Sequence, residues 1–279
     1  MNESRTPLFS NNPVMLAAGG HDPCGGAGIQ ADIEAAAAMG VHAVTALTCL
    51  TIQDTGNVCG MEPTDPGLLR RQIETLFADI PIHCCKIGLI GSAGAARVLA
   101  ELLGAPDAPP LVLDPVLAAG GGANLSGERL IESIRAELIP KCSLLTPNLP
   151  EAQHLSGWST PGDCAAELTR LGCAHVLVTG GHEETDRVIN RLYDANGLVN
   201  EWEWPRLPHG YHGSGCTLAS AAAALLAKGI DLANAVEQAQ RFTWRTLADA
   251  MQLGRGQLIP RRRNVALDQY ASTAGSSGS

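Results

Sequence analysis

Short apolar segments alternate along this chain with longer segments of helical spacing, and this alternation is the strongest constraint on its fold. The apolar segments mostly end in glycine or polar residues, and Val41–Leu50 is rich in β-branched residues, which is typical of buried strands. Strands that alternate with helices in this way predict right-handed βαβ units and a mostly parallel sheet. The expected strands are Val14–Ala18, Val41–Leu50, Lys86–Ile90, Leu111–Leu113, Ser143–Leu145 and His175–Thr179.

The rhythm changes between Arg191 and Trp204, where two β-like runs flank a turn that contains Asn196 and Gly197. An Asn-Gly turn between such runs is a strong hairpin signal, so we expect an antiparallel edge on the sheet. Asp231 is the expected N-cap of the last helix. The expected helices are Ile29–Met39, Leu68–Phe77, Ala93–Leu103, Glu128–Leu138, Leu149–Leu155, Ala165–Leu171, Cys216–Lys228 and Leu232–Met251.

Length alone allows one large α/β domain or two smaller ones, and the absence of a polar linker favours one. The chain has 279 residues, of which 45% are hydrophobic, and a chain of this size buries about three quarters of its unfolded surface. No polar linker divides it, so we expect one doubly wound domain over residues 14–264. The polar residues 1–13 and the small, polar residues 265–279 are expected to be flexible.

Charge and cysteine usage argue against several classes of protein. The formal net charge of −9 argues against binding to nucleic acid or to an acidic membrane. No segment approaches about eighteen unbroken apolar residues, so we expect no membrane span. The nine cysteines include no CxxC pair, so we interpret them as reduced thiols and expect a cytoplasmic protein without a zinc knuckle.

Polar and glycine clusters follow the expected strands, and their position is informative. In doubly wound sheets, ligands bind beyond the carboxyl ends of the parallel strands. We therefore predict a binding site along this rim of the sheet. The clusters are the Gly20 loop, Gln53, Asp114, Asn148, Gly180-Gly181 and the Gly213 loop.

The Gly213 loop, His212-Gly213-Ser214-Gly215-Cys216, comes directly before an alanine-rich helical segment. The first N–H groups of a helix lack internal partners, and the helix dipole adds positive charge, so such a start binds anions. A thiol there is expected to have a depressed pKa and to act as a base near neutrality. The alternative is that the two glycines only make a tight turn and Cys216 packs as a small apolar residue.

The first glycine loop, Gly20 to Gly28, does not match either common nucleotide-binding motif. It lacks the G-x-G-x-x-G spacing of dinucleotide-binding folds, and no acidic residue closes a second strand about twenty residues later. It also lacks the Gly-Lys-Ser/Thr of a Walker loop. A nucleotide, if bound, must be held in another way.

Asn148 and Glu151 are a second candidate binding feature, at the start of an expected helix. An amide carbonyl and a carboxylate at this spacing suit a hydrated Mg²⁺, which takes few protein ligands. The alternative is a capping box, in which the two residues only terminate the helix. Together with an anion site on the same rim, the pair suits phosphoryl transfer. Cys216 would then take the proton of the acceptor hydroxyl or hold the acceptor oxygen in line.

An ordered set of motifs resembles the hydroxymethylpyrimidine/phosphomethylpyrimidine kinases of thiamine biosynthesis, within the ribokinase-like superfamily. The resemblance extends from about Val14 to Leu253, and each motif alone is modest. Cysteine at position 216 favours this vitamin-precursor branch, because sugar kinases of the superfamily carry aspartate there. The motifs are Asp22–Asp32, Thr45–Thr48 with Gln53, Lys86–Gly88, Leu113–Val116, Thr146–Ala152, Gly180–His182 and His212–Leu218.

The resemblance implies a three-layer α/β/α sandwich and a reaction in which ATP phosphorylates 4-amino-5-hydroxymethyl-2-methylpyrimidine and then its monophosphate. It also implies a homodimer and Mg²⁺ that is held mainly through the phosphates, with Glu151 acting indirectly. The implied substrate-binding residues are Gly20, Ala27, Asp32, Gln53 and Leu89, and the implied ATP- and Mg²⁺-directing residues are Asp114, Asn148, Glu151, Thr179 and Gly181. The implied anion hole is Gly213, Ser214, Gly215 and Cys216, with Cys216 as the catalytic residue.

Two departures from the family pattern remove positive charge. The family carries a lysine where this chain has Thr179, and a Lys-Ser-Gly where this chain has the Ala118–Gly122 loop. Each charge-assisted contact is worth about 1.5–3 kcal/mol, so these losses should weaken ATP binding or transition-state neutralisation. Arg187 and His182 are candidates to replace the missing charge.

Two other functions remain open at this point. A pyridoxal or pyridoxamine kinase would share the architecture, although the first glycine loop and Gln53 resemble the pyrimidine branch more closely. A pyrimidine-binding regulatory protein that has lost phosphoryl transfer would explain Thr179 and the glycine-rich loop. The retention of Cys216, Asn148 and Glu151 favours an active kinase.

Overall fold

The computed structural model describes residues 12–105, 107–118, 126–182 and 185–263. The predicted flexible tails lie almost entirely outside these residues, as does most of the Ala118–Gly122 loop. One nine-stranded sheet runs through the described residues.

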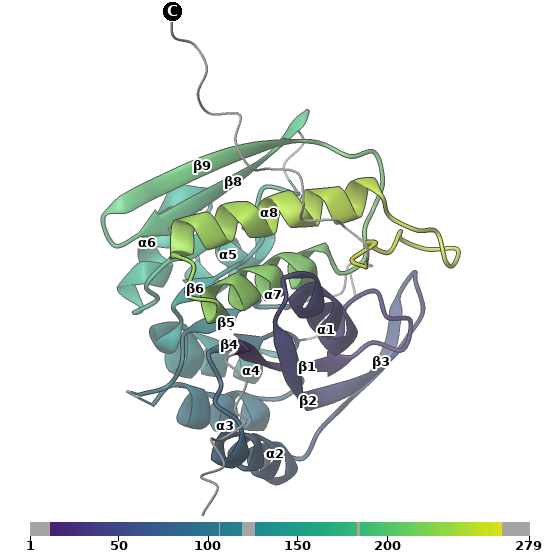
Figure 1. Ribbon diagram of the computed structural model, residues 1–279. Helices are drawn as coiled ribbons and strands as arrows, with labels where there is room; N and C mark the ends of the chain where they lie inside the picture. The colour runs from purple at the N-terminus through teal and green to yellow at the C-terminus, as the bar shows by residue number, and fades with distance from the viewer. Residues whose placement is uncertain (1–11, 106, 119–125, 183–184, 264–279) are drawn as a thin grey trace, which may run out of the picture.

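The sheet has the strand order β3-β2-β1-β4-β5-β6-β7-β8-β9 (Figure 1). The six strands from β2 to β7 in this order are parallel, whereas β3, β8 and β9 are antiparallel to their neighbours. The bounds are β1 Val14–His21, β2 His42–Gln53, β3 Val58–Pro63, β4 Cys84–Ile87, β5 Leu111–Leu113, β6 Leu144–Leu145, β7 Val176–Val178, β8 Arg187–Asp194 and β9 Gly197–Pro205.

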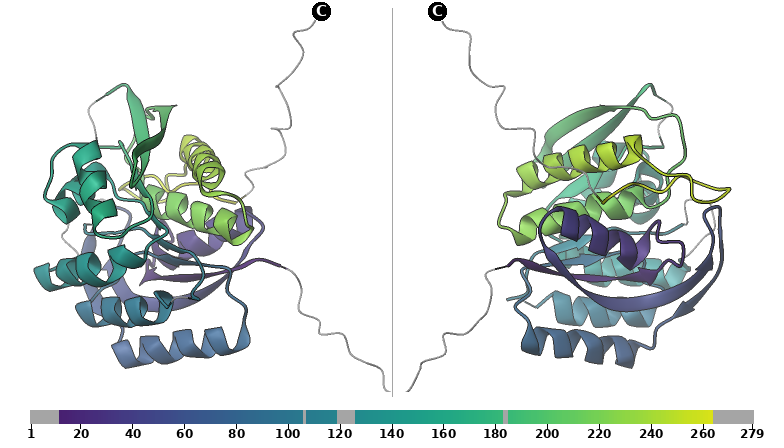
Figure 2. Two further views of the ribbon diagram at one scale, coloured as in Figure 1. Left: turned by 90° about the vertical axis from the view of Figure 1, so that its left-hand side faces the viewer. Right: turned by 45° about the vertical axis from the view of Figure 1, so that its right-hand side comes forward.

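Helices cover both faces of the sheet and confirm the predicted α/β/α sandwich (Figure 2). One apolar core joins the sheet to α1 Gly28–Ala38, α7 Ser214–Ala227 and α8 Leu232–Ala248. The core on the other face joins the sheet to α2 Pro66–Asp79, α3 Ala93–Leu103, α4 Glu128–Ser133, α5 Leu149–Ser156 and α6 Pro161–Arg170. The predicted edge hairpin is β8–β9, with its turn at Asp194–Gly197.

Two elements differ from the prediction. Strand β3 was missed because Val58–Pro63 is short, contains Gly60 and ends in proline, all of which weaken a strand signal. It gives the sheet a second antiparallel edge. The segment predicted as one helix over 128–138 is α-helical only to Ser133, continues as a π-helical turn over Ile134–Leu138 and ends in a 3₁₀ turn that contains Pro140.

Helix α7 is the element that positions the site. Its residues up to Ala224 are small apart from Leu218, and most of the helix is buried against the sheet, α1 and α8. Small side chains let the helix lie close to β1, β4 and β5, and its N-terminus faces the carboxyl ends of those strands (Figure 1). None of the helices in the described part of the chain combines the length and hydropathy that a membrane-crossing helix needs.

Candidate active site

A cavity of about 730 Å³ lies at the carboxyl ends of the parallel strands, where the rim of polar clusters was predicted. Loops after the parallel strands, the start of α7 and one end of α8 line it. Of the predicted site residues, all except Asp32 line this cavity: Gly20, Ala27, Gln53, Leu89, Asp114, Asn148, Glu151, Thr179, Gly181, Gly213, Ser214, Gly215 and Cys216. The structure therefore brings the predicted set together, while the role of each residue stays a prediction.

Gly213 is the N-cap of α7 and has a left-handed backbone, with φ of 83°. A Cβ at this position would lie 1.9 Å from the carbonyl oxygen of Gly26, so no other residue fits without movement of the first glycine loop. The helix begins at Ser214, and the carbonyl of Gly213 accepts its first backbone bond from Thr217. The N–H groups of Ser214, Gly215 and Cys216 therefore have no acceptor within the helix, and the predicted anion site depends on this arrangement.

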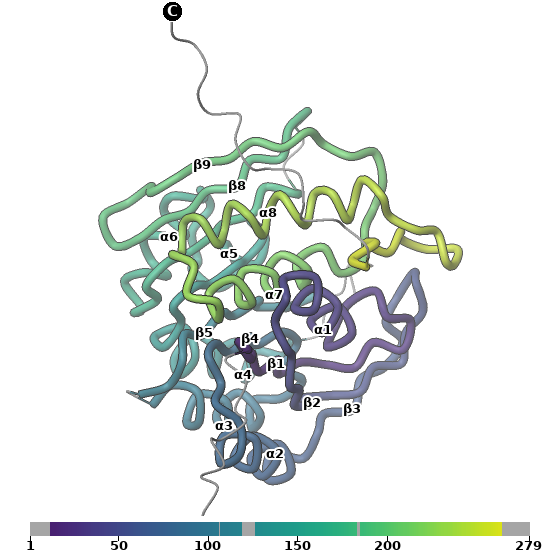
Figure 3. Tube along the Cα trace, in the orientation of Figure 1, coloured from purple at the N-terminus to yellow at the C-terminus, as the bar shows by residue number. Residues whose placement is uncertain are grey.

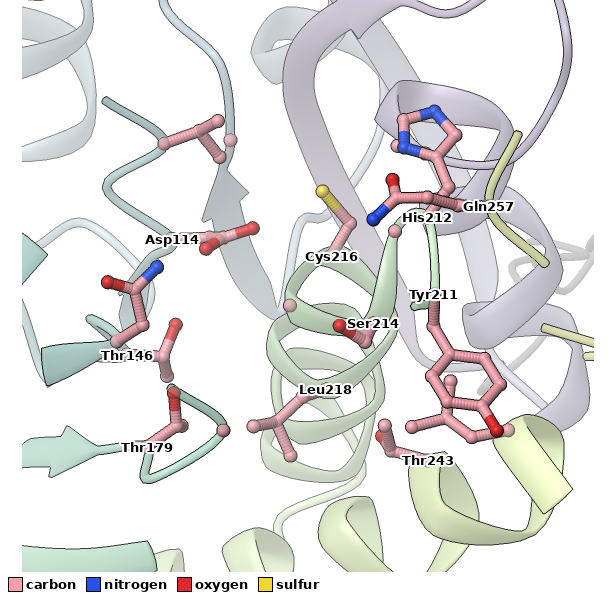
Figure 4. Close-up of a pocket in the computed structure, with 18 of the residues that line it drawn as sticks. Asp114, Thr146, Thr179, Tyr211, His212, Ser214, Cys216, Leu218, Thr243 and Gln257 are labelled. Carbon is pink, nitrogen blue, oxygen red and sulfur yellow. The ribbon is translucent and has the colours of Figure 1, made fainter. Parts of the chain in front are cut away.

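Cys216 is buried on the first turn of α7, and its sulfur and the Asp114 carboxylate face the same space (Figure 4). Burial raises the pKa of this thiol to about 12; Lys86 opposes the rise, whereas Asp114 and Asp32 add to it. The predicted depression of the pKa is therefore wrong. The helix start is present, but loss of hydration and two carboxylates outweigh it. Cys216 is a thiol at neutral pH.

Lys86 lies on β4 directly beneath the start of α7, and sequence reasoning did not identify it as a site residue. Its side chain is wholly buried, and its Nζ lies 2.8 Å from Oδ1 of Asp32, which is equally buried. Burial opposes the ammonium charge, but Asp32, Cys216 and Asp114 together outweigh burial and the pKa of Lys86 is raised. Ser220 on α7 also donates to Oδ1 of Asp32, over 2.5 Å. The sequence signal that could have identified Lys86 is a lysine within an otherwise apolar strand.

Asp32 therefore lies behind the cavity wall rather than in it. The resemblance implied that Asp32 contacts the substrate, but its carboxylate is 0% exposed and faces Lys86 and Ser220. The reason is that Asp32 lies just after the first turn of α1, and α1 packs against α7. Its placement favours a positioning role, in which it holds the Lys86 ammonium beneath the cavity floor.

Asp114, which is buried, and Glu151, which is half-buried, form a pair of carboxyl groups on the other side of Cys216. Burial raises the pKa of Asp114, while Lys86 and Cys216 act in the opposite direction. Burial and then the charge of Asp114 raise the pKa of Glu151 to about 8. Within the described residues, Oδ2 of Asp114 is buried without a hydrogen-bond partner. Two crowded carboxyl groups and an unsatisfied oxygen fit a hard divalent cation such as Mg²⁺.

Asn148 and Glu151 also form the capping box that was the alternative interpretation. The Asn148 side chain accepts from the Glu151 N–H over 2.9 Å, and Glu151 accepts from the Asn148 N–H over 3.0 Å. The capping interpretation is confirmed. It does not exclude the magnesium role, because both residues also line the cavity. The capping box fixes the carboxylate of Glu151 at the cavity wall.

The opposite end of the cavity is formed by the ends of β1, β2 and β4. Gln53 is the last residue of β2, and Gly20 faces Cys49 and Leu89 so closely that a Cβ would lie 2.9 Å from the Cys49 sulfur. Thr51 donates to the carbonyl of His21 over 2.8 Å and fixes this strand end. Gly20 therefore packs closely against the two side chains that face it, and both Gly20 and Gln53 line this end of the cavity.

Two contacts that were not predicted join distant loops at the site. Nε2 of His212 lies 2.9 Å from Oδ2 of Asp22, which ties the residue before Gly213 to the first glycine loop. The guanidinium of Arg262 is fully buried and donates to the carbonyl of Gly26 and, over 2.8 Å, to Oγ1 of Thr217. Arg262 comes from the segment after α8, which returns past the start of α7 toward α1 (Figure 3).

The cavity wall beside Thr179 and Gly181 carries Arg206. Its guanidinium donates to the carbonyl of Gly181 over 2.9 Å and to that of Thr185 over 2.5 Å. Among the described residues that line the cavity, lysine and arginine occur at Lys86 and Arg206. Arg187 pairs with Glu203 instead and does not line the cavity, whereas His182 does.

Comparisons with known proteins agree with this geometry. The family model described as phosphomethylpyrimidine kinase matches residues 22–260. The hydroxymethylpyrimidine/phosphomethylpyrimidine kinase of Haemophilus influenzae is 34% identical over 89% of this chain and 96% of its own length. The thiamine biosynthesis bifunctional protein ThiED of Geobacter sulfurreducens is 36% identical over 91% of this chain. This chain spans 52% of that bifunctional protein, or about half its length.

Solved structures show the same fold. An ADP complex of Bacillus subtilis pyridoxal kinase has a TM-score of 0.82 and 27% identity, and the match covers 90% of this chain and 97% of that one. Phosphomethylpyrimidine kinase from Clostridium difficile has a TM-score of 0.72 and 31% identity, and the match covers 83% of this chain and 97% of that one. Both the pyrimidine branch and the pyridoxal branch are thus structural relatives.

Proposed function

The chain belongs to the phosphomethylpyrimidine kinase family, and from this premise we propose that it phosphorylates 4-amino-5-hydroxymethyl-2-methylpyrimidine and then its monophosphate with ATP. The product of the two steps is the pyrimidine diphosphate used in thiamine biosynthesis. One observation carries the proposal: the N-terminus of α7 and the Asp114–Glu151 pair face each other across one cavity. Phosphoryl transfer requires an anion site and a cation site in one cavity.

The pyrimidine ring occupies the end of the cavity between Gly20 and Gln53. The Gln53 amide offers both a donor and an acceptor, which suits the edge of an aminopyrimidine. The hydroxymethyl group then points toward Cys216. The N–H groups at the start of α7 stabilise the charge of the transferred phosphoryl group, and the helix holds these groups in a fixed orientation.

Cys216 holds the acceptor oxygen in line with the phosphoryl group. A thiol with a pKa of about 12 is already protonated at neutral pH and cannot accept the hydroxyl proton. The orienting role of Cys216 therefore outweighs a role as a base. Phosphoryl transfer passes through a loose transition state that makes little demand on a strong base. Lys86 adds a fixed positive charge beneath the cavity floor.

ATP lies with its phosphates between Asp114 and the Gly213 loop. Asp114 and Asn148 would hold Mg²⁺, with Glu151 acting through water, and Mg²⁺ when bound neutralises the phosphate oxygens. Arg206 supplies positive charge on the wall beside Thr179, where the family carries a lysine. ATP analogue and ADP complexes of structurally related pyridoxal kinases support the use of ATP.

Pyridoxal kinase is the second candidate function. It is favoured by the fold comparison, in which the Bacillus subtilis pyridoxal kinase has a higher TM-score than the Clostridium difficile pyrimidine kinase. The pyrimidine activity is preferred because the family model and the curated relatives name it. Steady-state kcat/KM for the pyrimidine alcohol, its monophosphate and pyridoxal, measured by ADP release, separates the two. A higher value for pyridoxal would overturn the pyrimidine assignment.

The cysteines and the exposed face of β2 suggest where the protein works and how it assembles. Nine free cysteines support a reducing, cytoplasmic location. A homodimer is supported by Leu50 and Ile52, whose side chains are 50% and 63% exposed on the same face of β2. Sedimentation of the wild type against an Ile52→Lys variant tests the dimer, because burial of the introduced charge would dissociate it.

A further inference from the structure

Three side chains with metal-binding atoms meet where the first glycine loop touches the residue before Gly213. One ligand atom from each of Asp22, Cys24 and His212 lies within 4.8 Å of the other two. Asp22 is buried, and Cys24 and His212 are half-buried. These residues stand apart from the Asp114–Glu151 pair and play no part in the proposed phosphoryl transfer.

Hydrogen bonds already hold the three groups in a ligand-like arrangement. The Cys24 sulfur lies 2.9 Å from Oδ1 of Asp22, and Nε2 of His212 lies 2.9 Å from Oδ2. Metal binding replaces such protons, because thiolate and neutral imidazole are the ligating forms. Tetrahedral Zn²⁺ binds O and N at about 2.0–2.1 Å and S at about 2.3 Å, which separates ligand atoms by about 3.5 Å. The two contacts with the Asp22 oxygens need to open by about 0.5 Å. The Cys24 sulfur and the His212 nitrogen, which lie within 4.8 Å of each other, need to adopt the same separation of about 3.5 Å.

Backbone groups around the site fix the ligands from outside. The carboxylate of Asp22 also accepts from the N–H groups of Cys24, over 2.9 Å, and Ala27, over 2.7 Å. Gly26 lets the imidazole approach, because a Cβ there would lie 2.2 Å from Cδ2 of His212. Such outer contacts orient ligands and raise metal affinity. Asp22 and His212 line the cavity, which leaves a fourth position open toward it.

We propose that Asp22, Cys24 and His212 form a binding site for a borderline divalent transition-metal ion such as Zn²⁺. A donor set of one thiolate, one imidazole and one carboxylate suits such ions and disfavours Mg²⁺, which prefers oxygen alone. The ion would cross-link segments that lie 190 residues apart in the sequence. The site therefore couples metal availability to the position of the Gly213 loop.

Cobalt is the probe that tests the site, because Co²⁺ substitutes for Zn²⁺ and absorbs visibly. The full chain is titrated with Co²⁺ in excess Mg²⁺ and without ATP. One equivalent should bind with a thiolate-to-cobalt charge-transfer band and tetrahedral visible bands, and Zn²⁺ should displace it. Binding should strengthen as pH rises, because the ion must displace the thiol proton of Cys24.

Two matched variants make the test specific. Cys24→Ser keeps a hydrogen bond to Asp22 but removes the sulfur, so it should lose the charge-transfer band and bind Co²⁺ at least about tenfold more weakly. Cys59→Ser, at an exposed cysteine on β3, should behave as the wild type. Thermal unfolding without metal establishes that each variant is folded.

Absence of the charge-transfer band in the wild type would overturn the proposal, and so would its persistence in folded Cys24→Ser. If Cys24→Ser does not fold, the wild type and His212→Asn are compared by the shift in melting temperature on adding Zn²⁺. The wild type should be stabilised and the variant should not, and equal shifts would overturn the site. The titrations contain no ATP or pyrimidine, so their outcome is independent of the proposed kinase activity.

Discussion

Nζ of Lys86 lies 2.8 Å from Oδ1 of Asp32, and both side chains are wholly removed from solvent beneath the start of α7. Removal of one partner leaves an uncompensated buried charge, whereas removal of both does not. We therefore expect Lys86→Met to lower the free energy of unfolding by about 3–5 kcal/mol in urea titrations. The double variant Lys86→Met/Asp32→Leu should recover much of that loss.

The matched control for this pair is Arg70→Gln. Arg70 forms its ion pair with Glu101 on the surface, so the loss should be below about 1 kcal/mol. A cost for Lys86→Met no larger than that for Arg70→Gln would contradict the positioning role of the buried pair.

Cys216 should act by orientation rather than as a base. Loss of a group that acts only in the transition state costs about a hundred- to a thousandfold in kcat, so Cys216→Ala should fall in this range with pyrimidine binding retained. Cys216→Ser keeps a hydrogen-bonding group and should retain more activity than the alanine variant. Isothermal titration with the pyrimidine and steady-state kinetics measure the two effects. Equal activity of the alanine and serine variants would argue against orientation by this side chain.

Arg206 should contribute to ATP binding in place of the lysine that Thr179 replaces. A charge-assisted contact of about 1.5–3 kcal/mol predicts that Arg206→Gln raises KM for ATP by about ten- to a hundredfold, with KM for the pyrimidine unchanged. Adding Thr179→Lys to this variant should restore part of the loss, because it returns positive charge to the same wall.

Arg187→Gln is the control for this charge, because Arg187 pairs with Glu203 at the surface of the same hairpin. Its kinetic constants should match those of the wild type. If Arg206→Gln changes both KM values alike, the arginine supports the loop rather than the phosphates.

Glu151 should make the stability of the metal-free chain depend on pH. In the unfolded chain Glu151 loses its proton near its ordinary pKa of 4.5, whereas burial and Asp114 hold the folded-state pKa at about 8. Between these values the folded state binds more protons than the unfolded state, so stability falls as pH rises through this window. Glu151→Gln should flatten the fall. Urea midpoints of the wild type and of Glu151→Gln are measured at intervals from pH 5 to pH 8 in EDTA. Parallel curves for the two proteins would refute the contribution of Glu151.

The fold was predictable because its signals are local. The apolar run Leu111–Leu113 is followed by a polar residue and matches the bounds of β5, and the other predicted strands overlap observed ones with shifted ends. The turn at Asn196-Gly197 marks the β8–β9 hairpin. Strand β3 was missed because its pairing with β2, rather than its own sequence, makes it a strand. The site residues were found where they follow strands, since strand ends converge on one rim.

What the sequence could not supply are effects that depend on distant neighbours. The start of α7 is readable locally, but the burial and the carboxylates that raise the pKa of Cys216 are not. The same holds for the contact between Asp22 and His212, which lie 190 residues apart, and for Arg262, which reaches Gly26 from near the end of the described chain. These contacts hold the two glycine loops together and require the folded structure to be seen.

In the proposed reaction the γ-phosphate of ATP moves to a pyrimidine alcohol in this cavity. The decisive measurement is the fate of the label from γ-labelled ATP. With Mg²⁺ and 4-amino-5-hydroxymethyl-2-methylpyrimidine, the account predicts label first in the pyrimidine monophosphate and then in the diphosphate. Cys216→Ala should slow both steps. Label that appears only in inorganic phosphate, or that stays in ATP while the pyrimidine binds, would contradict the account.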